Sequence, residues 1–355
     1  MQKIIFVNAT SLNAGGALAI LNKYIEDIII QRGELIYRYY IFVPDNCELL
    51  INDENIVIIK NKDNSFYVNR NFWNLIGMKL WSFKNSISPN ELYSLQNYYP
   101  LGFNSSNIFK RLYLHTVIPF SDVKWNIFKK EERILWLYKN IYSHLIERSI
   151  RKSDNVIIQT HWFKEKLIEQ LKINKEVFSI ERPEIESIEL ESTFNRRNKN
   201  QSFKIFYPAS EMIYKNHEIL YKMMNILVNE KKMKDIVLYL TIASNNVTAN
   251  FYIEKFKLRN NIILIGNINF KSVLKYYNTV NVLVFPSKLE SFGLPLIEAQ
   301  QFNLPIIAND MALYKEVIGN YKEKVLFCNS EDAYQWVQAV CQIKVLTEPA
   351  NLNNS

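Results

Sequence analysis

The sequence predicts an α/β protein made of two doubly wound parallel-sheet domains. Short runs of isoleucine, valine, leucine and aromatic residues, bounded by Asn, Gly or Pro, recur along the whole chain. Such continuous apolar runs are typical of strands buried on both faces, and helical patterns between them make neighbouring strands parallel. Because domains usually hold roughly 100–200 residues, a chain of 355 residues is expected to form two.

The strand pattern occurs on both sides of one long polar stretch. It is found at residues 3–8, 39–44, 111–116 and 154–160, and again at 203–208, 236–242, 261–266, 281–286 and 304–309. The polar stretch, residues 186–202, has the composition of a linker. We therefore expect an N-terminal domain at 1–185, a C-terminal domain at 203–345 and a frayed polar tail at 346–355.

Composition places the chain among soluble globular proteins. Hydrophobic residues make up 48% and charged residues 22%, and no run reaches the roughly 18 apolar residues of a membrane-spanning helix. We expect no signal peptide. Cys47, Cys328 and Cys341 lack CxxC spacing, which argues against a zinc site or a disulfide framework and favours the cytoplasm.

The net charge of +8 favours an anionic partner without identifying it. Nucleic acid, a phosphorylated substrate and anionic lipid all remain open on charge alone. An AT-rich genome, which enriches Asn, Ile and Lys, accounts for the same excess.

The most informative segment is FPSKLESFGLPLIEAQQFNLPIIAND, residues 285–310, which predicts strand, loop, helix and strand. Glu290 and Glu298 stand on either side of the helix N-terminus, where free amides near Gly293 and Leu294 and the helix dipole suit a diphosphate. Glu298 is placed to accept hydrogen bonds from ribose hydroxyls, and Glu290 from hydroxyls of a transferred sugar. The segment therefore predicts a nucleotide-sugar site.

This segment resembles the retaining glycosyltransferases of the GT-B type, specifically family 4, which carry two glutamates in E-x7-E spacing. The matching residues are Pro286-Ser287, Glu290, Phe292-Gly293-Leu294-Pro295 and Glu298-Ala299. The resemblance implies two Rossmann-like domains facing a cleft, and a donor site formed by Glu290, Ser291, Phe292, Gly293, Leu294 and Glu298. The alternative is that both carboxylates merely cap a helix and face solvent.

A second segment, YPASEMIYKNHEIL at residues 207–220, follows a strand and opens a helix. In the family a basic residue here holds the donor phosphates, and Lys215-Asn216 resembles that position. An ammonium group there offsets the charge that the leaving diphosphate gains. Many members carry an arginine five residues before this lysine, whereas this chain has Ser210. The alternative is an exposed lysine at a helix start.

The N-terminal half resembles the acceptor side of the same family. Gly15-Gly16 precedes a predicted helix and resembles the family's glycine loop, although an ordinary strand-to-helix turn has the same pattern. His115 ends a predicted strand, and strand ends line the crevice where open α/β sheets bind ligands. The resemblance implies that His115 lies beside the transferred sugar and that Asn97 faces the same cleft. A satisfied core histidine is the alternative.

No metal or other cofactor is expected. The 4 histidines show no metal-ligand spacing, and no Asp-x-Asp is present. His161 and His217 fall at early helical positions, where a polar side chain caps the helix or faces solvent.

Residues 124–152 predict a basic helix with a broad apolar face, and Trp125 and Trp136 are candidate interfacial anchors. Basic side chains such as Lys129, Lys130 and Arg133 favour an anionic membrane surface. The alternative is an ordinary helix packed on the N-terminal sheet.

Together these features predict a retaining glycosyltransferase that moves a hexose-type sugar from a nucleotide-sugar donor to a glycan or lipid-linked acceptor. The expected setting is bacterial surface polysaccharide or lipopolysaccharide synthesis, with no nucleic acid partner. Two alternatives remain, a GT-B sugar-nucleotide 2-epimerase and a non-catalytic nucleotide-sugar-binding subunit, the latter suggested by Ser210 and the short C-terminus.

Overall fold

The computed structural model describes residues 2–12, 15–30, 37–47, 49, 51, 53–61, 73–183 and 202–347. The chain forms two compact units, unit 1 with residues 1–128 and 133–182, and unit 2 with residues 129–132 and 183–355. Of the predicted linker, residues 186–202, all but Ser202 lie outside the described residues, as does the tail from residue 348. Among the helices of the described ranges, none is long and apolar enough to cross a lipid bilayer.

Unit 1 is built on a parallel sheet that, over the described residues, has 7 strands in the order β3-β2-β1-β4-β5-β6-β7. Its strands are β1 (Lys3–Asn8), β2 (Tyr37–Pro44), β3 (Ile56–Asn61), β4 (Glu91–Ser94), β5 (Phe109–Tyr113), β6 (Asn155–Ile158) and β7 (Phe178–Ile180). The chain order reverses direction between β1 and β4, which pair in parallel from Ile5↔Glu91 to Asn8↔Ser94. Neighbouring strands on either side of such a switch point leave a crevice at their carboxyl ends.

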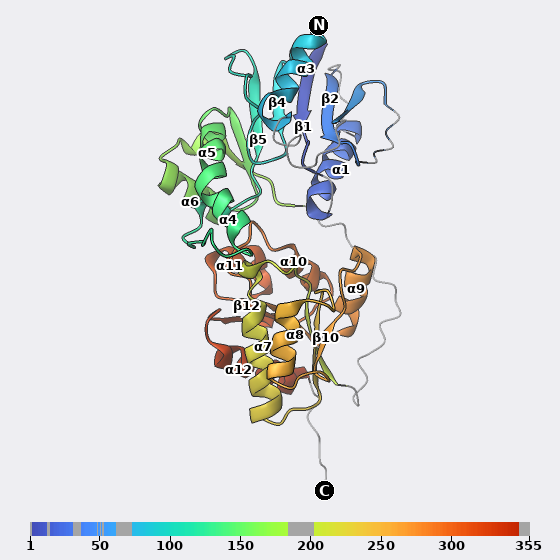
Figure 1. Ribbon diagram of the computed structural model, residues 1–355, viewed down its shortest axis with the longest axis vertical. Coiled ribbons are helices and arrows are strands. Elements are labelled where there is room, and N and C mark those ends of the chain that lie inside the picture. Colours follow the sequence, from blue (N-terminus) through green and yellow to red (C-terminus); the bar gives the residue numbers. More distant parts are fainter. Residues whose placement is uncertain are drawn as a thin grey trace. The chain divides into compact units, whose positions relative to one another are not determined.

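Helices cover both faces of this sheet (Figure 1). They are α1 (Gly15–Ile30), α3 (Met78–Lys84), α4 (Arg133–Leu137), α5 (Ser143–Arg151) and α6 (His161–Leu171), with shorter helical turns at η1 (Trp73–Gly77), η2 (Ile118–Phe120), η3 (Tyr138–Tyr142) and η4 (Lys175–Val177). Because strand side chains alternate between faces, Phe6 and Phe42 point away from α1 and meet Trp81 of α3, with ring centroids 5.9 and 5.2 Å away.

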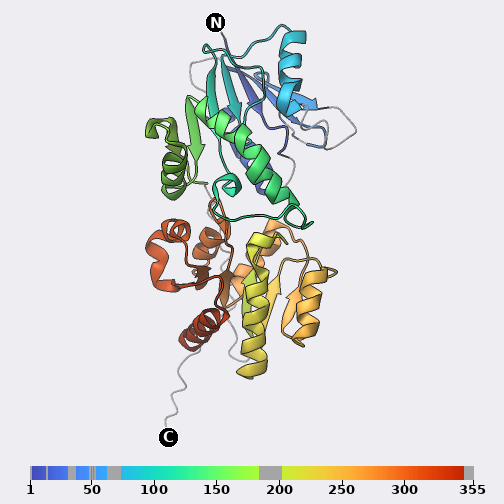
Figure 2. The same ribbon diagram turned by 60° about the vertical axis from the view of Figure 1, so that its left-hand side comes forward.

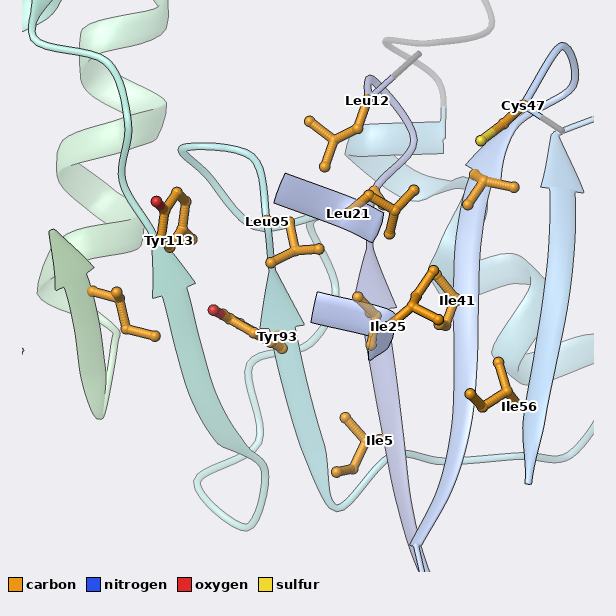
Figure 3. Packing of buried hydrophobic residues seen from close by; sticks show 14 residues of the cluster. Ile5, Leu12, Leu21, Ile25, Ile41, Cys47, Ile56, Tyr93, Leu95 and Tyr113 are labelled. Carbon is orange, nitrogen blue, oxygen red and sulfur yellow. The ribbon is translucent and has the colours of Figure 1, made fainter. Parts of the chain in front are cut away.

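The opposite face of the sheet forms the core against α1, as Figure 3 shows. Leu21 and Ile25 of α1 pack with Ile41 of β2 and Leu95, which follows β4. Leu21 and Ile41 are fully buried. Burying a side chain of this size contributes roughly 1.5–3 kcal/mol before entropy is counted, so this contact fixes α1 on the strands whose ends carry the polar residues described below.

Unit 2 repeats the architecture with a parallel sheet of 6 strands over the described residues, in the order β10-β9-β8-β11-β12-β13. The strands are β8 (Phe203–Tyr207), β9 (Ile236–Leu240), β10 (Ile262–Leu264), β11 (Val282–Phe285), β12 (Ile306–Asn309) and β13 (Val325–Cys328). Its switch point lies between β8 and β11, which pair at Val282↔Ile205 and Leu283↔Phe206.

The helices of unit 2 are α7 (His217–Asn225), α8 (Val247–Lys255), α9 (Phe270–Thr279), α10 (Leu294–Gln301), α11 (Ala312–Ile318) and α12 (Ala333–Thr347). Shorter turns occur at η5 (Ile213–Lys215), η6 (Ile226–Glu230) and η7 (Gly319–Lys324). α7 and α12 lie side by side (Figure 2). On α9, the ring of Tyr276 stacks on Phe206 of β8 with centroids 5.0 Å apart, which sets the position of α9 over the strand before the switch point.

All nine predicted strand segments contain strands, and the α/β fold class is confirmed. The prediction omitted β3, β4, β7 and β13. The single helix predicted over residues 124–152 is wrong at its start, because helical structure begins only at Arg133 and continues as α4, η3 and α5 to Arg151.

Candidate functional site

The candidate site of unit 2 lies at the switch point of its sheet. Tyr207 is the last residue of β8 and Phe285 the last of β11, and the chain leaves both strands at the same edge because they pair in parallel. The loop after β8 carries Lys215, and the loop after β11 carries Glu290. Two loops that are 75 residues apart in sequence therefore meet outside the carboxyl ends of neighbouring strands.

Lys215 is held by its own backbone at the end of η5. The hydroxyl of fully buried Tyr207 donates to the Lys215 carbonyl at 2.9 Å. Asn216 follows in the left-handed region at φ 58°, a conformation that Asn tolerates better than most residues. The side-chain nitrogen Nδ2 of Asn216 donates to the backbone carbonyls of Ser330 at 2.9 Å and Pro286 at 3.4 Å. Asn216 thus joins the two loops and supports Lys215.

The ammonium group of Lys215 forms an ion pair with Glu290, at 2.5 Å from Nζ to Oε1. Both side chains are largely buried, with 17% and 13% of their surfaces exposed. The Tyr214 ring lies under the ammonium, 5.4 Å from its centroid, and burial together with the Glu290 charge raises the Tyr214 pKa to about 12. In this poorly hydrated setting each charge depends on the other.

The loop before Glu290 is fixed by backbone contacts. The Lys288 amide donates to the Tyr214 carbonyl at 2.8 Å, and the Ser287 carbonyl accepts from Asn309 at 3.0 Å and from the Tyr314 hydroxyl at 2.9 Å. Ser287 itself is fully buried. The geometry of the Lys215–Glu290 pair is therefore set by rigid neighbours rather than by two flexible side chains alone.

Glu298 lies inside α10 and is 9% exposed. The hydroxyl of Tyr277, from α9, donates to Glu298 Oε2 at 2.7 Å. Burial raises the pKa of the Glu298 carboxyl, and the Tyr277 hydrogen bond opposes that rise by stabilising the ionised form. Glu298 is thus a buried acceptor that is held in one orientation, which excludes for this residue the alternative of a carboxylate that faces solvent.

Gly293 begins α10 and its backbone requires glycine. Its φ is +95° and its ψ is 54°, where other residues are strained. A Cβ at this position would lie 3.2 Å from Leu296 Cδ1. Phe292 is buried, Ser291 half-buried and Leu294 exposed. Of the first three residues of α10, Pro295 has no N–H and the Leu296 amide already donates to the Gly293 carbonyl at 2.9 Å. The Leu294 amide and the helix dipole remain to attract an anion.

The candidate residues of unit 1 follow β1, β4 and β5, at the switch point of its own sheet and on the strand next to it. His115 follows β5, and its backbone amide donates to Asn97 Oδ1 at 2.9 Å. The Asn97 amide nitrogen lies 3.3 Å from His115 Nε2. Gly15 and Gly16 are the first two residues of α1, so the helix begins at the glycines and not after them as predicted.

A buried polar network supports this part of unit 1. Gln96 Nε2 donates to Thr10 Oγ1 at 2.7 Å and also to the Asn8 side-chain oxygen, and Ser94 Oγ donates to the Tyr98 carbonyl at 2.7 Å. Fully satisfied buried networks of this kind hold one conformation. The loop that carries Asn97 is therefore ordered by residues from the ends of β1 and β4.

Three supporting residues were not predicted from the sequence. In the sequence, Tyr277 and Tyr207 look like ordinary aromatic core residues. The hydrogen bonds that they donate, to Glu298 and to the Lys215 carbonyl, produce no local sequence pattern. His217 was expected to cap α7 or face solvent, but it is buried beside the Tyr207 ring at 5.0 Å between centroids. Burial and the Lys215 charge lower the His217 pKa to about 4.

The chain is similar to several known proteins. Residues 189–352 match the family described as glycosyl transferases group 1. The O-antigen chain mannosyltransferase RfbU of Salmonella typhimurium is 21% identical over 223 residues, which cover 62% of this chain and 59% of that protein. The serotype-specific mannosyltransferase WbdA of Escherichia coli is 38% identical over 61 residues, 17% of this chain and 8% of that protein. The chain therefore spans less than two thirds of the length of either relative.

The fold comparison extends over both units. The sucrose-phosphate synthase of Thermosynechococcus elongatus superposes with a TM-score of 0.72 at 15% sequence identity, covering 98% of this chain and 90% of that one. Both units thus have the Rossmann-like architecture of the GT-B fold. Residues 189–352 therefore resemble the group 1 glycosyl transferases, and both units have the fold of the sucrose-phosphate synthase.

Proposed function

We propose that the chain is a retaining glycosyltransferase that moves a hexose-type sugar from a nucleotide-sugar donor to a glycan or lipid-linked acceptor. Mannose is the first candidate for this sugar. The observation that carries the proposal is the Lys215–Glu290 ion pair at the switch point of unit 2, on the loop that leads to buried Glu298. The names of RfbU and WbdA support mannose and a role in bacterial surface polysaccharide synthesis.

The leaving diphosphate is the part of the donor that gains charge during transfer. Lys215 has N–H donors beyond the one it gives Glu290, so its ammonium can contact a phosphate oxygen without leaving the ion pair. The Leu294 amide at the start of α10 adds a donor aligned with the helix dipole. In a site poor in water these fixed charges stabilise the transition state more than the substrate.

The two glutamates bind the other two parts of the donor, the ribose and the transferred sugar. Glu298, oriented by Tyr277, accepts hydrogen bonds from the two ribose hydroxyls. Glu290 binds hydroxyls of the transferred sugar and keeps Lys215 in place. His115 contacts the sugar, and Asn97 supports His115 on the acceptor side. Departure of the leaving group and attack of the acceptor occur on the same face of the sugar, so the anomeric configuration is retained.

No metal or cofactor takes part in this mechanism. A divalent ion would neutralise a diphosphate, and in this proposal Lys215 and the positive end of the α10 dipole compensate its charge instead. The proposal therefore predicts catalysis in the absence of divalent ions, which can be tested directly.

Thermal-shift measurements with UDP-, GDP-, ADP- and dTDP-sugars identify the donor, because a bound ligand stabilises the folded state. Release of nucleoside diphosphate is then measured with and without oligosaccharide and lipid-linked saccharide acceptors. Release that requires an acceptor supports transfer. Release with no acceptor at an equal rate indicates the 2-epimerase alternative, and binding with no turnover under any condition indicates a non-catalytic subunit.

We also propose that the enzyme works at the cytoplasmic face of the membrane, where lipid-linked acceptors are found. Support comes from exposed Lys130 and Arg133 and from the exposed apolar side chains of Phe128, Ile134 and Ile141. Lys139, in contrast, donates to the carbonyls of Ser121 and Val123, so it is not available to lipid headgroups.

Sedimentation with vesicles tests this location. Binding should require anionic lipid, weaken as salt rises, and fall when Lys129, Lys130 and Arg133 are changed to Glu. Pelleting that is equal with neutral and anionic vesicles, or absent at low salt, would show that this surface does not bind membranes.

A further inference from the structure

The contact between Asn97 and His115 determines which way the Asn97 amide points. The backbone amide of His115 lies 2.9 Å from Asn97 Oδ1. A backbone amide can only donate, so the atom facing it must be the side-chain oxygen. The NH₂ group of Asn97 is then the atom that faces His115 Nε2, at 3.3 Å.

The same contact determines the protonation of the His115 ring. An NH₂ group can only donate, so His115 Nε2 must accept and carries no proton. A neutral ring then has its proton on Nδ1. The other tautomer and the doubly protonated ring would both place two N–H groups against each other across this contact. Burial lowers the His115 pKa to about 4, in agreement with a neutral ring near pH 7.

The remaining ring nitrogen is left without a partner. His115 Nδ1 is buried and has no hydrogen-bond partner among the described residues. The Tyr113 ring packs beside the His115 ring with centroids 5.9 Å apart, and the Tyr113 hydroxyl accepts from Gln159 at 2.8 Å. A buried donor without a partner costs about 1–3 kcal/mol, so an acceptor that reaches Nδ1 on substrate binding would be stabilising.

Asn97 is held where only a few residue types fit. Its φ is 27°, a region in which Asn and Asp are enriched among residues other than glycine. The Gln96 and Ser94 hydrogen bonds described above fix the loop around it. The position therefore favours a short side chain that presents one acceptor to the His115 backbone and one donor to its ring.

We propose that Asn97 is a positioning residue that fixes His115 as the neutral Nδ1–H tautomer, and that Nδ1–H donates a hydrogen bond to an oxygen of the sugar substrate. The assignment of the tautomer follows from the geometry of unit 1 alone. The identification of the acceptor as a sugar oxygen rests on the proposed glycosyltransferase function.

Nitrogen NMR of the full chain labelled with ¹⁵N-histidine tests the tautomer. The chain has 4 histidines, and the His115 signals are assigned by their loss in His115→Gln. In the wild type at pH 7 we expect a protonated Nδ1 and an unprotonated Nε2. In Asn97→Asp the same shape carries an acceptor in place of the donor, so the proton should move to Nε2 and the His115 pKa should rise from about 4.

Asn155→Asp is the matched control. Asn155 also belongs to unit 1 and donates to Ser179 Oγ at 3.1 Å, a hydroxyl that can donate back to a carboxylate. This variant adds the same charge and should leave the His115 tautomer unchanged. Asn97→Gly, which tolerates the positive φ and lacks the amide, should give a mixture of both tautomers. A wild-type ring protonated at Nε2, or an Asn97→Asp ring like the wild type, would overturn the proposal.

The substrate contact is tested by kinetics on the same variants. Asn97→Asp should lower kcat at least about tenfold while the Kd for free UDP or GDP stays within twofold, because the predicted diphosphate contacts belong to unit 2. Equal kcat in the wild type and Asn97→Asp would overturn the role of Nδ1–H. A wild type that binds neither nucleotide but shows the expected tautomer would overturn the proposed function and the sugar contact, while the tautomer assignment stands.

Discussion

Lys215 and Glu290 form an ion pair of 2.5 Å between two loops that follow neighbouring strands of unit 2. The pair joins the residue proposed to offset the charge of the leaving diphosphate to the residue proposed to bind the transferred sugar. Because both side chains are mostly buried, loss of either partner leaves the other charge uncompensated.

Replacement of Lys215 by Ala should lower turnover at least about a hundredfold, since it removes the cation from the leaving group. It should also reduce the free energy of unfolding by roughly 3 kcal/mol because Glu290 is left without its partner. Lys222→Ala is the control, since Lys222 pairs with Glu218 on the exposed side of α7. Steady-state rates and denaturant unfolding provide the measurements.

The double variant Lys215→Met/Glu290→Gln separates catalysis from folding. Neutral side chains of similar size remove both charges, so most of the lost stability should return. Turnover should remain at least about a hundredfold below the wild type. Recovery of activity together with stability would mean that Lys215 is only a structural partner of Glu290.

Tyr277→Phe should weaken binding of the nucleoside diphosphate, and more strongly at low pH. Burial raises the Glu298 pKa and the Tyr277 hydroxyl lowers it, so removal of the hydroxyl raises that pKa further. Ribose hydroxyls need the ionised carboxylate as acceptor. The fall in affinity with falling pH should therefore begin at a higher pH in the variant than in the wild type, as measured by calorimetric titration.

Tyr321→Phe controls for the loss of a tyrosine hydroxyl. Tyr321 donates to the Leu304 carbonyl at 3.0 Å in the same unit, so its replacement should leave the pH dependence of binding unchanged. Identical pH profiles for Tyr277→Phe and the wild type would show that Tyr277 has no influence on Glu298 in the binding step.

Gly293→Ala should destabilise the chain by about 1–3 kcal/mol, because alanine is strained at φ +95°. It should also weaken nucleotide binding, since a Cβ 3.2 Å from Leu296 displaces the start of α10. Gly266→Ala is matched to it, with φ +73° and nothing within 4 Å of a Cβ. That variant should lose stability and retain nucleotide affinity; equal affinities in both variants would contradict a role for the start of α10.

Transfer should continue in excess EDTA, because the proposed charge compensation comes from Lys215 and the positive end of the α10 dipole. Initial rates with and without chelator should agree. Loss of activity that returns on addition of Mg²⁺ or Mn²⁺ would contradict the metal-free mechanism.

Most of the fold could be predicted from the sequence because short apolar runs bounded by turn residues recur along the whole chain, and this pattern is typical of buried parallel strands. β4 and β7 were not predicted since ELYS and FSI are too short for a periodic pattern. β3 and β13, with IVIIKN and VLFC, do carry an apolar run. Neither was predicted, and the state of such short segments is decided by strand pairing more than by local propensity.

The site was predictable where one continuous segment carries it, as with Glu290, Gly293 and Glu298. The Lys215–Glu290 contact depends on β8 and β11 lying next to each other. The order of strands across a switch point cannot be predicted from local sequence. Tyr277 and Glu298 likewise meet through the packing of two helices. His217 was misjudged because hydrophilic residues at helix starts are usually exposed, whereas this one packs on Tyr207.

The anomeric configuration of the product tests the central claim most directly. The purified chain is incubated with its nucleotide-sugar donor and an acceptor, and the one-bond carbon–proton coupling at the anomeric carbon of the product is compared with that of the donor by NMR. Retaining transfer predicts the same configuration in both, with no product formed by the Lys215→Ala variant over the same time. An inverted product, or equal product from that variant, would contradict it.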